Sequence, residues 1–208
     1  GSFGGTVTVD YTGGGTFTLG NSDKTVALTP AASADATLKI SSGTLSLFSG
    51  NVNWSQKLVM GDGTTLTVQD GPAVSGYYNY DATSINGDGF TFSGAATFGT
   101  GVNLTTQYGK NIKFTGVLTA ASGFSISGAD SEYTYYTLTG TVNQIGGTIA
   151  ITRNSTSLGI NASGSLGTAA VTTSSGSQYL TYYGTAGEAA DVNVNSITTR
   201  TQQTLYVG

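Results

Sequence analysis

Two pairs of closely spaced carboxylates are the first residues of this sequence whose types and spacing suggest chemistry. Asp130 and Glu132 stand two positions apart in a strand-like segment, so both side chains would lie on one face. Glu188 and Asp191 stand three positions apart in a segment typical of a loop. Glycoside hydrolases use two carboxylates about 5–10 Å apart across a cleft. A carbohydrate-active β-helix that uses Asp130 and Glu132 is therefore one hypothesis, and solvated surface charge is the other.

The sequence contains no histidine and no cysteine, which removes several kinds of catalytic and metal site. Histidine is the commonest general base and the usual activator of a serine nucleophile, and cysteine supplies thiolate zinc sites and disulfides. Residues 84–89 (SINGDG) imitate the first half of a calcium-binding loop, but Ala95 stands where a bidentate glutamate is needed. We therefore expect a protein that is not an enzyme and that holds no metal and no cofactor.

Tyrosines are the best candidates for a binding surface. Many of the 12 tyrosines fall in three clusters, SGYYNYD, EYTYYT and QYLTYYG. Exposed tyrosine beside asparagine, serine and glycine is typical of adaptable recognition surfaces, and adjacent tyrosines of a strand point to opposite faces. The candidate ligand-binding residues are Tyr77, Tyr78, Tyr80, Tyr133, Tyr135 and Tyr182. The alternative is that these rings pack the core or cap the coil, since aromatic side chains are mainly buried mass.

The charge pattern excludes two classes of partner. Charged residues make up 9% of the chain, whereas a typical soluble domain has about 25%. The seven lysines and arginines are scattered, and the net charge is −4. Nucleic acid needs clustered cations, and a membrane helix needs roughly 18 consecutive apolar residues. We expect neither a nucleic-acid partner nor membrane insertion of this chain.

Short strands dominate the expected secondary structure. Ten segments alternate apolar and polar residues and are bounded by glycine, asparagine, aspartate or serine, which is the pattern of β-strands. They are GTVTVDY (5–11), GTFTLG (15–20), ATLKI (36–40), QKLVM (56–60), GFTFSG (89–94), NIKFTG (111–116), GFSISG (123–128), YTYYTLTG (133–140), GTIAITR (147–153) and QTLYVG (203–208).

Two pairs of strand-like segments repeat at nearly the same interval. TLSLFSG (44–50) matches TLTVQDG (65–71) at an offset of 21, and ATLKI (36–40) precedes QKLVM (56–60) by 20. A repeat of roughly 20 residues is the length of one β-solenoid coil. In such a coil small apolar residues face inward, threonine and serine face solvent, and glycine and asparagine make the corners.

The repeat becomes irregular further along the chain. GDGFTFSGAATFG (87–99) matches AASGFSISGADSE (120–132) at an offset of 34, and the regular period fades after about residue 70. Residues 72–88 are the best candidate for an insertion. The sequence predicts an all-β fold, a right-handed parallel β-solenoid with irregular loop insertions, and a β-sandwich is the alternative. Ice binding by aligned threonine rows requires a fixed repeat, which only one pair of segments keeps, so the sequence argues against it.

Four segments carry a resemblance to a known family. They are ATLKISSGTLSLFSG (36–50), GFTFSGAATFGTGVNLTT (89–106), IKFTGVLTAASGFSISG (112–128) and TGTVNQIGGTIAITRNSTSLGINASGSLG (139–167). They resemble passenger regions of bacterial autotransporters and related β-helical surface adhesins. The resemblance implies a right-handed parallel β-helix exported through the bacterial outer membrane to the cell surface. No catalytic motif of the family is present.

We expect residues 1–208 to form a single β-solenoid, a fragment of a longer exported protein. The expected function is non-enzymatic adhesion or cell–cell aggregation through polar, tyrosine-bearing faces and the loop near 72–88. The expected partners are glycans or proteins of host or bacterial surfaces, or further copies of the chain, and the expected location is cell-surface or extracellular. The alternatives are a structural stalk or surface-layer module without a ligand, and the carbohydrate-active β-helix.

Overall fold

The chain forms a parallel β-solenoid in the residues that its structure, a computed structural model, describes. These residues are 6–9, 15–20, 36–48, 52–69, 89–106, 111–128, 134–140, 142–160, 165–174, 178–182, 196–198 and 205–207. Short strands and turns account for all of them, with no helix. Each strand pair within them is parallel. The predicted solenoid is confirmed, and a sandwich of antiparallel strands is not what the chain forms.

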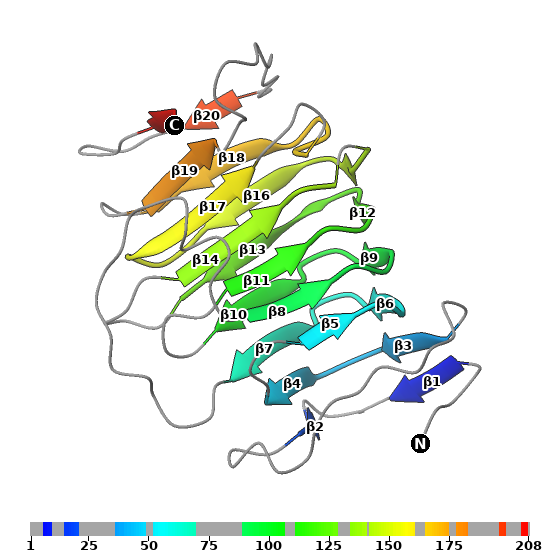
Figure 1. Cartoon of the computed structure of the whole chain (residues 1–208). Helices are drawn as coiled ribbons and strands as arrows, with labels where there is room; N and C mark the ends of the chain where they lie inside the picture. Colours follow the sequence, from blue (N-terminus) through cyan, green and yellow to red (C-terminus); the bar gives the residue numbers. More distant parts are fainter. Residues whose placement is uncertain are drawn as a thin grey trace.

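Three sheets form the sides of the solenoid, here named A, B and C (Figure 1). Sheet A contains β1 (Thr6–Val9), β3 (Thr37–Ile40), β6 (Lys57–Met60), β9 (Ala96–Phe98), β12 (Leu118–Ala120) and β15 (Gln144–Ile145). Sheet B contains β2 (Thr16–Leu19), β4 (Thr44–Phe48), β7 (Thr65–Gln69), β10 (Asn103–Thr106), β13 (Gly123–Ser127), β16 (Thr148–Ile151), β18 (Ala170–Thr173) and β20 (Ser196–Thr198). Sheet C contains β5 (Val52–Trp54), β8 (Gly89–Phe92), β11 (Asn111–Phe114), β14 (Thr134–Leu138), β17 (Thr156–Ile160), β19 (Gln178–Tyr182) and β21 (Leu205–Val207).

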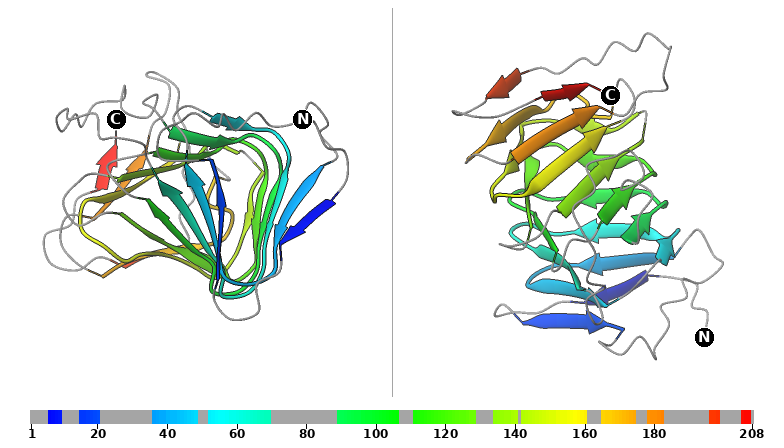
Figure 2. Two further views of the ribbon diagram at one scale, coloured as in Figure 1. Left: turned by 90° about the horizontal axis from the view of Figure 1, so that it is seen from below. Right: turned by 60° about the vertical axis from the view of Figure 1, so that its left-hand side comes forward.

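From β3 to β17 the chain visits the sheets in the order A, B, C, so one strand of each makes one coil. Among the described residues, β1 and β2 are followed by no strand of sheet C, and β18 to β21 alternate between sheets B and C. Seen along the stack, the three sheets enclose a triangle, and the strands of sheet B fan out from the corner that they share with sheet A (Figure 2, left). This fan is the ordinary twist of a β-sheet, accumulated over many strands. Each of the ten segments predicted as strands contains a strand of this solenoid.

The register confirms the two short repeats. Thr44 pairs with Thr65 at an offset of 21, and Leu38 pairs with Leu58 at an offset of 20. After residue 70 the coil keeps repeating, but the offset between paired strands is not fixed: it is 24 between β11 and β14, 25 between β13 and β16, and 26 between β18 and β20. An offset of 22 recurs in the later coils, between β8 and β11, β9 and β12, β10 and β13, β14 and β17, β16 and β18, and β17 and β19.

The match at an offset of 34 is not a repeat of the coil. Phe90 lies in sheet C, where it pairs with Ile112, whereas Phe124 lies in sheet B, where it pairs with Ile149. The two segments look alike because each begins a strand with a glycine followed by a buried phenylalanine. Similar local roles on different sheets therefore gave a false repeat.

One step of the register is much longer than the rest. Thr65 pairs with Asn103, thirty-eight positions on, and Leu58 pairs with Ala96 at the same interval. The additional residues belong to the connection between β7 and β8. The proposed insertion at 72–88 falls in this connection and lies outside the described residues.

The alternation of each strand supplies the core. In sheet B, Leu45, Leu66, Leu104 and Ile126 are at most 1% exposed, while the residues between them point outward. Inward side chains from all three sheets join in one continuous cluster. Each fully buried leucine or isoleucine contributes about 1.5–3 kcal/mol of hydrophobic stabilisation. Because successive side chains of a strand point to opposite faces, the strand conformation buries all the apolar residues of such an alternating segment.

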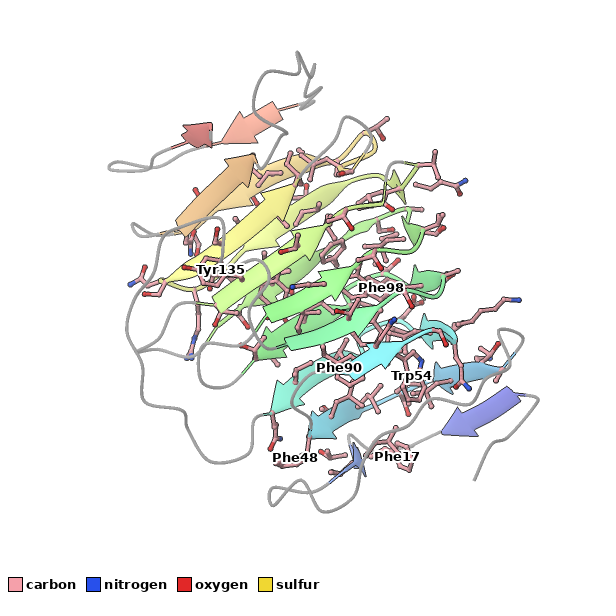
Figure 3. The ribbon with its side chains drawn as sticks, in the orientation of Figure 1. Phe17, Phe48, Trp54, Phe90, Phe98 and Tyr135 are labelled. Carbon is pink, nitrogen blue, oxygen red and sulfur yellow. The ribbon has the colours of Figure 1, made fainter. Side chains whose placement is uncertain are left out.

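Aromatic rings fill the middle of this core. Phe92 and Phe114 stack with ring centroids 4.9 Å apart. Phe98 meets Phe114 and Phe124 edge-on, at 5.6 and 5.4 Å. The series starts at Trp54, whose ring lies 6.3 Å from that of Phe90 (Figure 3). These contacts join residues of all three sheets.

Candidate functional site

The structure divides the tyrosines of the EYTYYT cluster between two environments. Tyr136 is 1% exposed and fills the core. Its hydroxyl lies 3.0 Å from the carbonyl oxygen of Leu104 and 2.5 Å from that of Ser127, and donates to these acceptors. Burial raises the pKa of Tyr136 well above its usual value. Its role is therefore to tie β14 to β10 and β13.

Tyr135 is the one candidate binding tyrosine whose side chain the structure describes. It occupies the outer side of sheet C, in register with Asn111 and Ser157, and is half-buried (Figure 3). Tyr182 ends β19, where it pairs with Ile160 and Val207. The remaining candidates, Tyr77, Tyr78, Tyr80 and Tyr133, lie outside the described residues.

The residues of the carboxylate hypothesis also lie outside the described part of the chain. Asp130, Glu132, Glu188 and Asp191 are not among the described residues, and Asp62 is the one acidic residue that is. Asp62 is exposed, and its Oδ1 accepts the backbone N–H of Thr100 at 2.7 Å. Within the described ranges, no group of three or more acidic side chains could hold a metal ion. No helix in those ranges is long and apolar enough to cross a membrane.

The most regular surface feature lies on the outer side of sheet B. The register aligns two columns of side chains across the strands, which we call the hydroxyl face. The first column is Thr16, Thr44, Thr65, Asn103, Ser125, Ala150 and Thr172. The second is Thr18, Ser46, Thr67, Thr105 and Ser127. Ten of these twelve residues carry a hydroxyl group and none is charged.

The side chains of the hydroxyl face are held in register by the backbone and by each other. Ser125 Oγ donates to Asn103 Oδ1 at 2.9 Å, so neighbouring coils are linked along the first column. Thr16 and Thr18 are exposed, and most of the other members are half-buried. Ser46 is 1% exposed, and its Oγ has no hydrogen-bond partner. Hydroxyl groups that stand in rows offer repeated donors and acceptors on a fixed frame.

The outer sides of the other two sheets differ from the hydroxyl face. Sheet A carries two exposed cations, Lys39 and Lys57. Sheet C carries Lys113, whose pKa is lowered by burial, between Thr91 and Thr137. Thr137 and Ser157 on the outer side of sheet C are almost fully buried. Among the described residues, the first column of sheet B is the longest outward row without a charged residue. A neutral row on sheet C crosses five strands, at Gly89, Asn111, Tyr135, Ser157 and Tyr179.

The polar strand segments that make this face are visible in the sequence, but their alignment across the strands was not predicted. The strings TFT (16–18), TLS (44–46), TLT (65–67), NLT (103–105) and SIS (125–127) are visible in the sequence. Their spacing changes from 28 to 21, 38 and 22 positions between successive strands. The argument that threonine rows cannot align because the period is not fixed is therefore wrong. Connections of different length still return the chain to the same register.

The fold and this surface define a class, a parallel β-solenoid with one extended neutral polar side. Comparison of the chain with protein families, with curated proteins and with solved structures gave no match.

Proposed function

We propose that this chain is a non-enzymatic module of a cell surface or of the extracellular space that mediates adhesion or cell–cell aggregation. The proposal agrees with the resemblance to autotransporter passengers and β-helical surface adhesins. The observation that carries it is the hydroxyl face, a column of outward residues that continues across seven strands of sheet B. The proposed partners are surface glycans, surface proteins or further copies of the chain.

The mechanism follows from repetition. One hydrogen bond between neutral groups contributes about 0.5–1.5 kcal/mol, because each group gives up its bond to water. A row of such groups on a rigid frame adds these small terms once the first contact is made. A face without charge also puts little electrostatic repulsion between two copies. Adhesion through many weak contacts therefore suits this surface better than one deep pocket.

The test is adhesion by beads that carry the chain. Wild-type beads are expected to cluster or to be retained on a panel of glycans and matrix proteins. The double variant Thr65→Lys/Thr105→Lys places two cations on the hydroxyl face and is expected to lose most of this adhesion. The matched control is Thr97→Lys, an exposed outward position of sheet A, which is expected to keep it. Circular dichroism checks that all proteins keep their strand content.

Failure of wild-type beads to cluster or bind would overturn this proposal and leave the stalk or surface-layer module in its place. Equal loss in the Thr97→Lys control would move the adhesive surface away from sheet B. The carbohydrate-active β-helix depends on Asp130 and Glu132, and no described residue favours it.

A further inference from the structure

We propose that the ligand of the hydroxyl face is a single neutral, unbranched polysaccharide chain lying across the strands, along the axis of the solenoid. This inference rests on the proposed function and names the class of partner that the face would take. Its basis is the charge, the spacing and the twist of sheet B.

Charge complementarity favours a neutral ligand. Ten of the twelve residues of the hydroxyl face are threonine or serine, and the other two, Asn103 and Ala150, also carry no formal charge. A nucleic acid, an acidic glycan or an anionic membrane would gain from clustered cations, which this face lacks. A neutral polysaccharide presents hydroxyl groups that both donate and accept hydrogen bonds. Ser, Thr and Asn side chains can likewise donate to them and accept from them.

The spacing of the columns favours a ligand that runs along the axis. Neighbouring strands of a sheet lie about 4.8 Å apart. This repeat is close to the length that one sugar unit adds to an extended β-1,4-linked chain. Each sugar unit would thus meet one coil, and the first column would span about seven units, one for each strand from β2 to β18.

The twist of sheet B favours a single chain over a flat crystal. Its strands fan out around the axis (Figure 2, left), so the columns follow a curved path. A planar lattice, such as the surface of ice or of crystalline polysaccharide, would touch only a short part of that path. A single polysaccharide chain can rotate about its glycosidic bonds and follow the curve.

An unused hydrogen-bonding group lies within the second column. Ser46 stands between Thr18 and Thr67 in register, is nearly fully buried, and has no partner for its Oγ. A buried hydroxyl without a partner costs about 1–3 kcal/mol. A ligand hydroxyl seated over β4 would supply the missing partner, after a small movement of the neighbouring side chains.

The test is titration of the isolated chain with neutral, unbranched β-1,4-linked glucose oligomers of increasing length. Affinity is expected to rise with each added unit up to about seven units. The double variant Thr67→Ala/Thr105→Ala is expected to bind the longest oligomer roughly tenfold more weakly, as the loss of two hydrogen bonds predicts. Thr97→Ala on sheet A is the matched control and is expected to bind like the wild type. Thr65→Ala provides a second test if the double variant does not fold.

Three results would overturn the inference. They are no binding of any oligomer, an affinity that stops rising after the first units, and tighter binding of carboxylated oligomers of the same length. Beads that still cluster through the hydroxyl face in such a case would leave the proposed function standing with a different partner. Loss of both bead adhesion and oligomer binding would remove the two proposals together.

Discussion

At the scale of single residues, Tyr136 shows how a polar side chain is accommodated inside a narrow coil. It is among the largest fully buried side chains, and it lies in register between Ile112 and Leu158. Its hydroxyl reaches carbonyl oxygens of β10 and β13, at the corner where sheet B leads to sheet C. Burying a hydroxyl without a hydrogen-bond partner would raise the free energy of the fold. The two carbonyl oxygens therefore allow the tyrosine ring to be buried.

Removing this hydroxyl is expected to destabilise the fold. Tyr136→Phe keeps the ring but removes the hydroxyl that donates to the carbonyls of Leu104 and Ser127, which should lower the free energy of unfolding by about 1–3 kcal/mol. Urea unfolding followed by circular dichroism measures the difference. The control is Tyr135→Phe on the half-buried outer side of β14, where a smaller change is expected. Equal losses in the two variants would contradict this role.

The same residue predicts a dependence on alkaline pH. An unfolded tyrosine loses its proton near pH 10, about the usual pKa. Because burial raises the pKa of Tyr136 in the fold, the folded chain keeps this proton after the unfolded chain has released it. The stabilisation is therefore fully present below about pH 10 and is lost as the pH rises further towards the folded pKa. Tyr136→Phe should lack this loss. The difference in free energy of unfolding between wild type and variant, measured by urea unfolding at several pH values, should therefore become smaller above about pH 10.

At the scale of elements, the corner between sheets A and B is made by glycines with positive φ. They are Gly43, Gly63, Gly101, Gly123 and Gly147. A side chain at such a φ is strained, which explains why glycine recurs at this corner while the strands around it vary. The corners differ in crowding. A Cβ at Gly123 would overlap the carbonyl of Thr148 on the next coil, whereas nothing lies within 4 Å of a Cβ at Gly63.

This difference predicts unequal effects of one substitution at two corners. Gly63→Ala should cost about 1 kcal/mol, the backbone strain alone. Gly123→Ala should cost a further 1–3 kcal/mol or so, because the coils at β13 and β16 must separate to admit the methyl group. Thermal and urea unfolding of the two variants give the comparison. A Gly63→Ala variant as unstable as Gly123→Ala would show that crowding does not decide the cost.

At the scale of the whole molecule, a solenoid is a stack in which each coil contacts its neighbours. Its stability is then close to a sum of coil terms and neighbour terms. The changes in free energy of unfolding caused by substitutions in distant coils should therefore add, whereas those caused by substitutions of facing side chains should not. Ile40 in β3 and Ile160 in β17 represent distant coils, and the stacked rings of Phe92 and Phe114 represent facing side chains.

Double-mutant cycles test this expectation. Ile40→Val and Ile160→Val should each cost about 0.5–1.5 kcal/mol, and their sum should predict the double variant within about 0.5 kcal/mol. Phe92→Leu and Phe114→Leu should deviate from additivity by about 0.5–3 kcal/mol, because each ring is the packing surface of the other. Unfolding in urea measures the wild type, the four single variants and the two double variants. Strong coupling of the two isoleucines would mean that the stack responds as one unit.

The sequence by itself determined the strands and the kind of fold. Period-2 alternation marks which residues face the core, because burial of every second side chain depends only on local order. The matches at 20 and 21 positions were enough to indicate a coil, since stacked strands need equivalent residues at equivalent places. Segments such as ATLKI and TLTVQDG therefore appear in the structure where the sequence predicts them.

The tertiary structure alone decided which strands are neighbours and which surface is regular. Connections of different length separate equivalent residues by 20 to 38 positions, so sequence spacing does not reveal the later register. Phe90 and Phe124 look alike in sequence but belong to different sheets. The hydroxyl face exists only once backbone hydrogen bonds between coils have aligned Thr65, Asn103 and Ser125. Alignment across coils is a property of long-range pairing, which local composition does not encode.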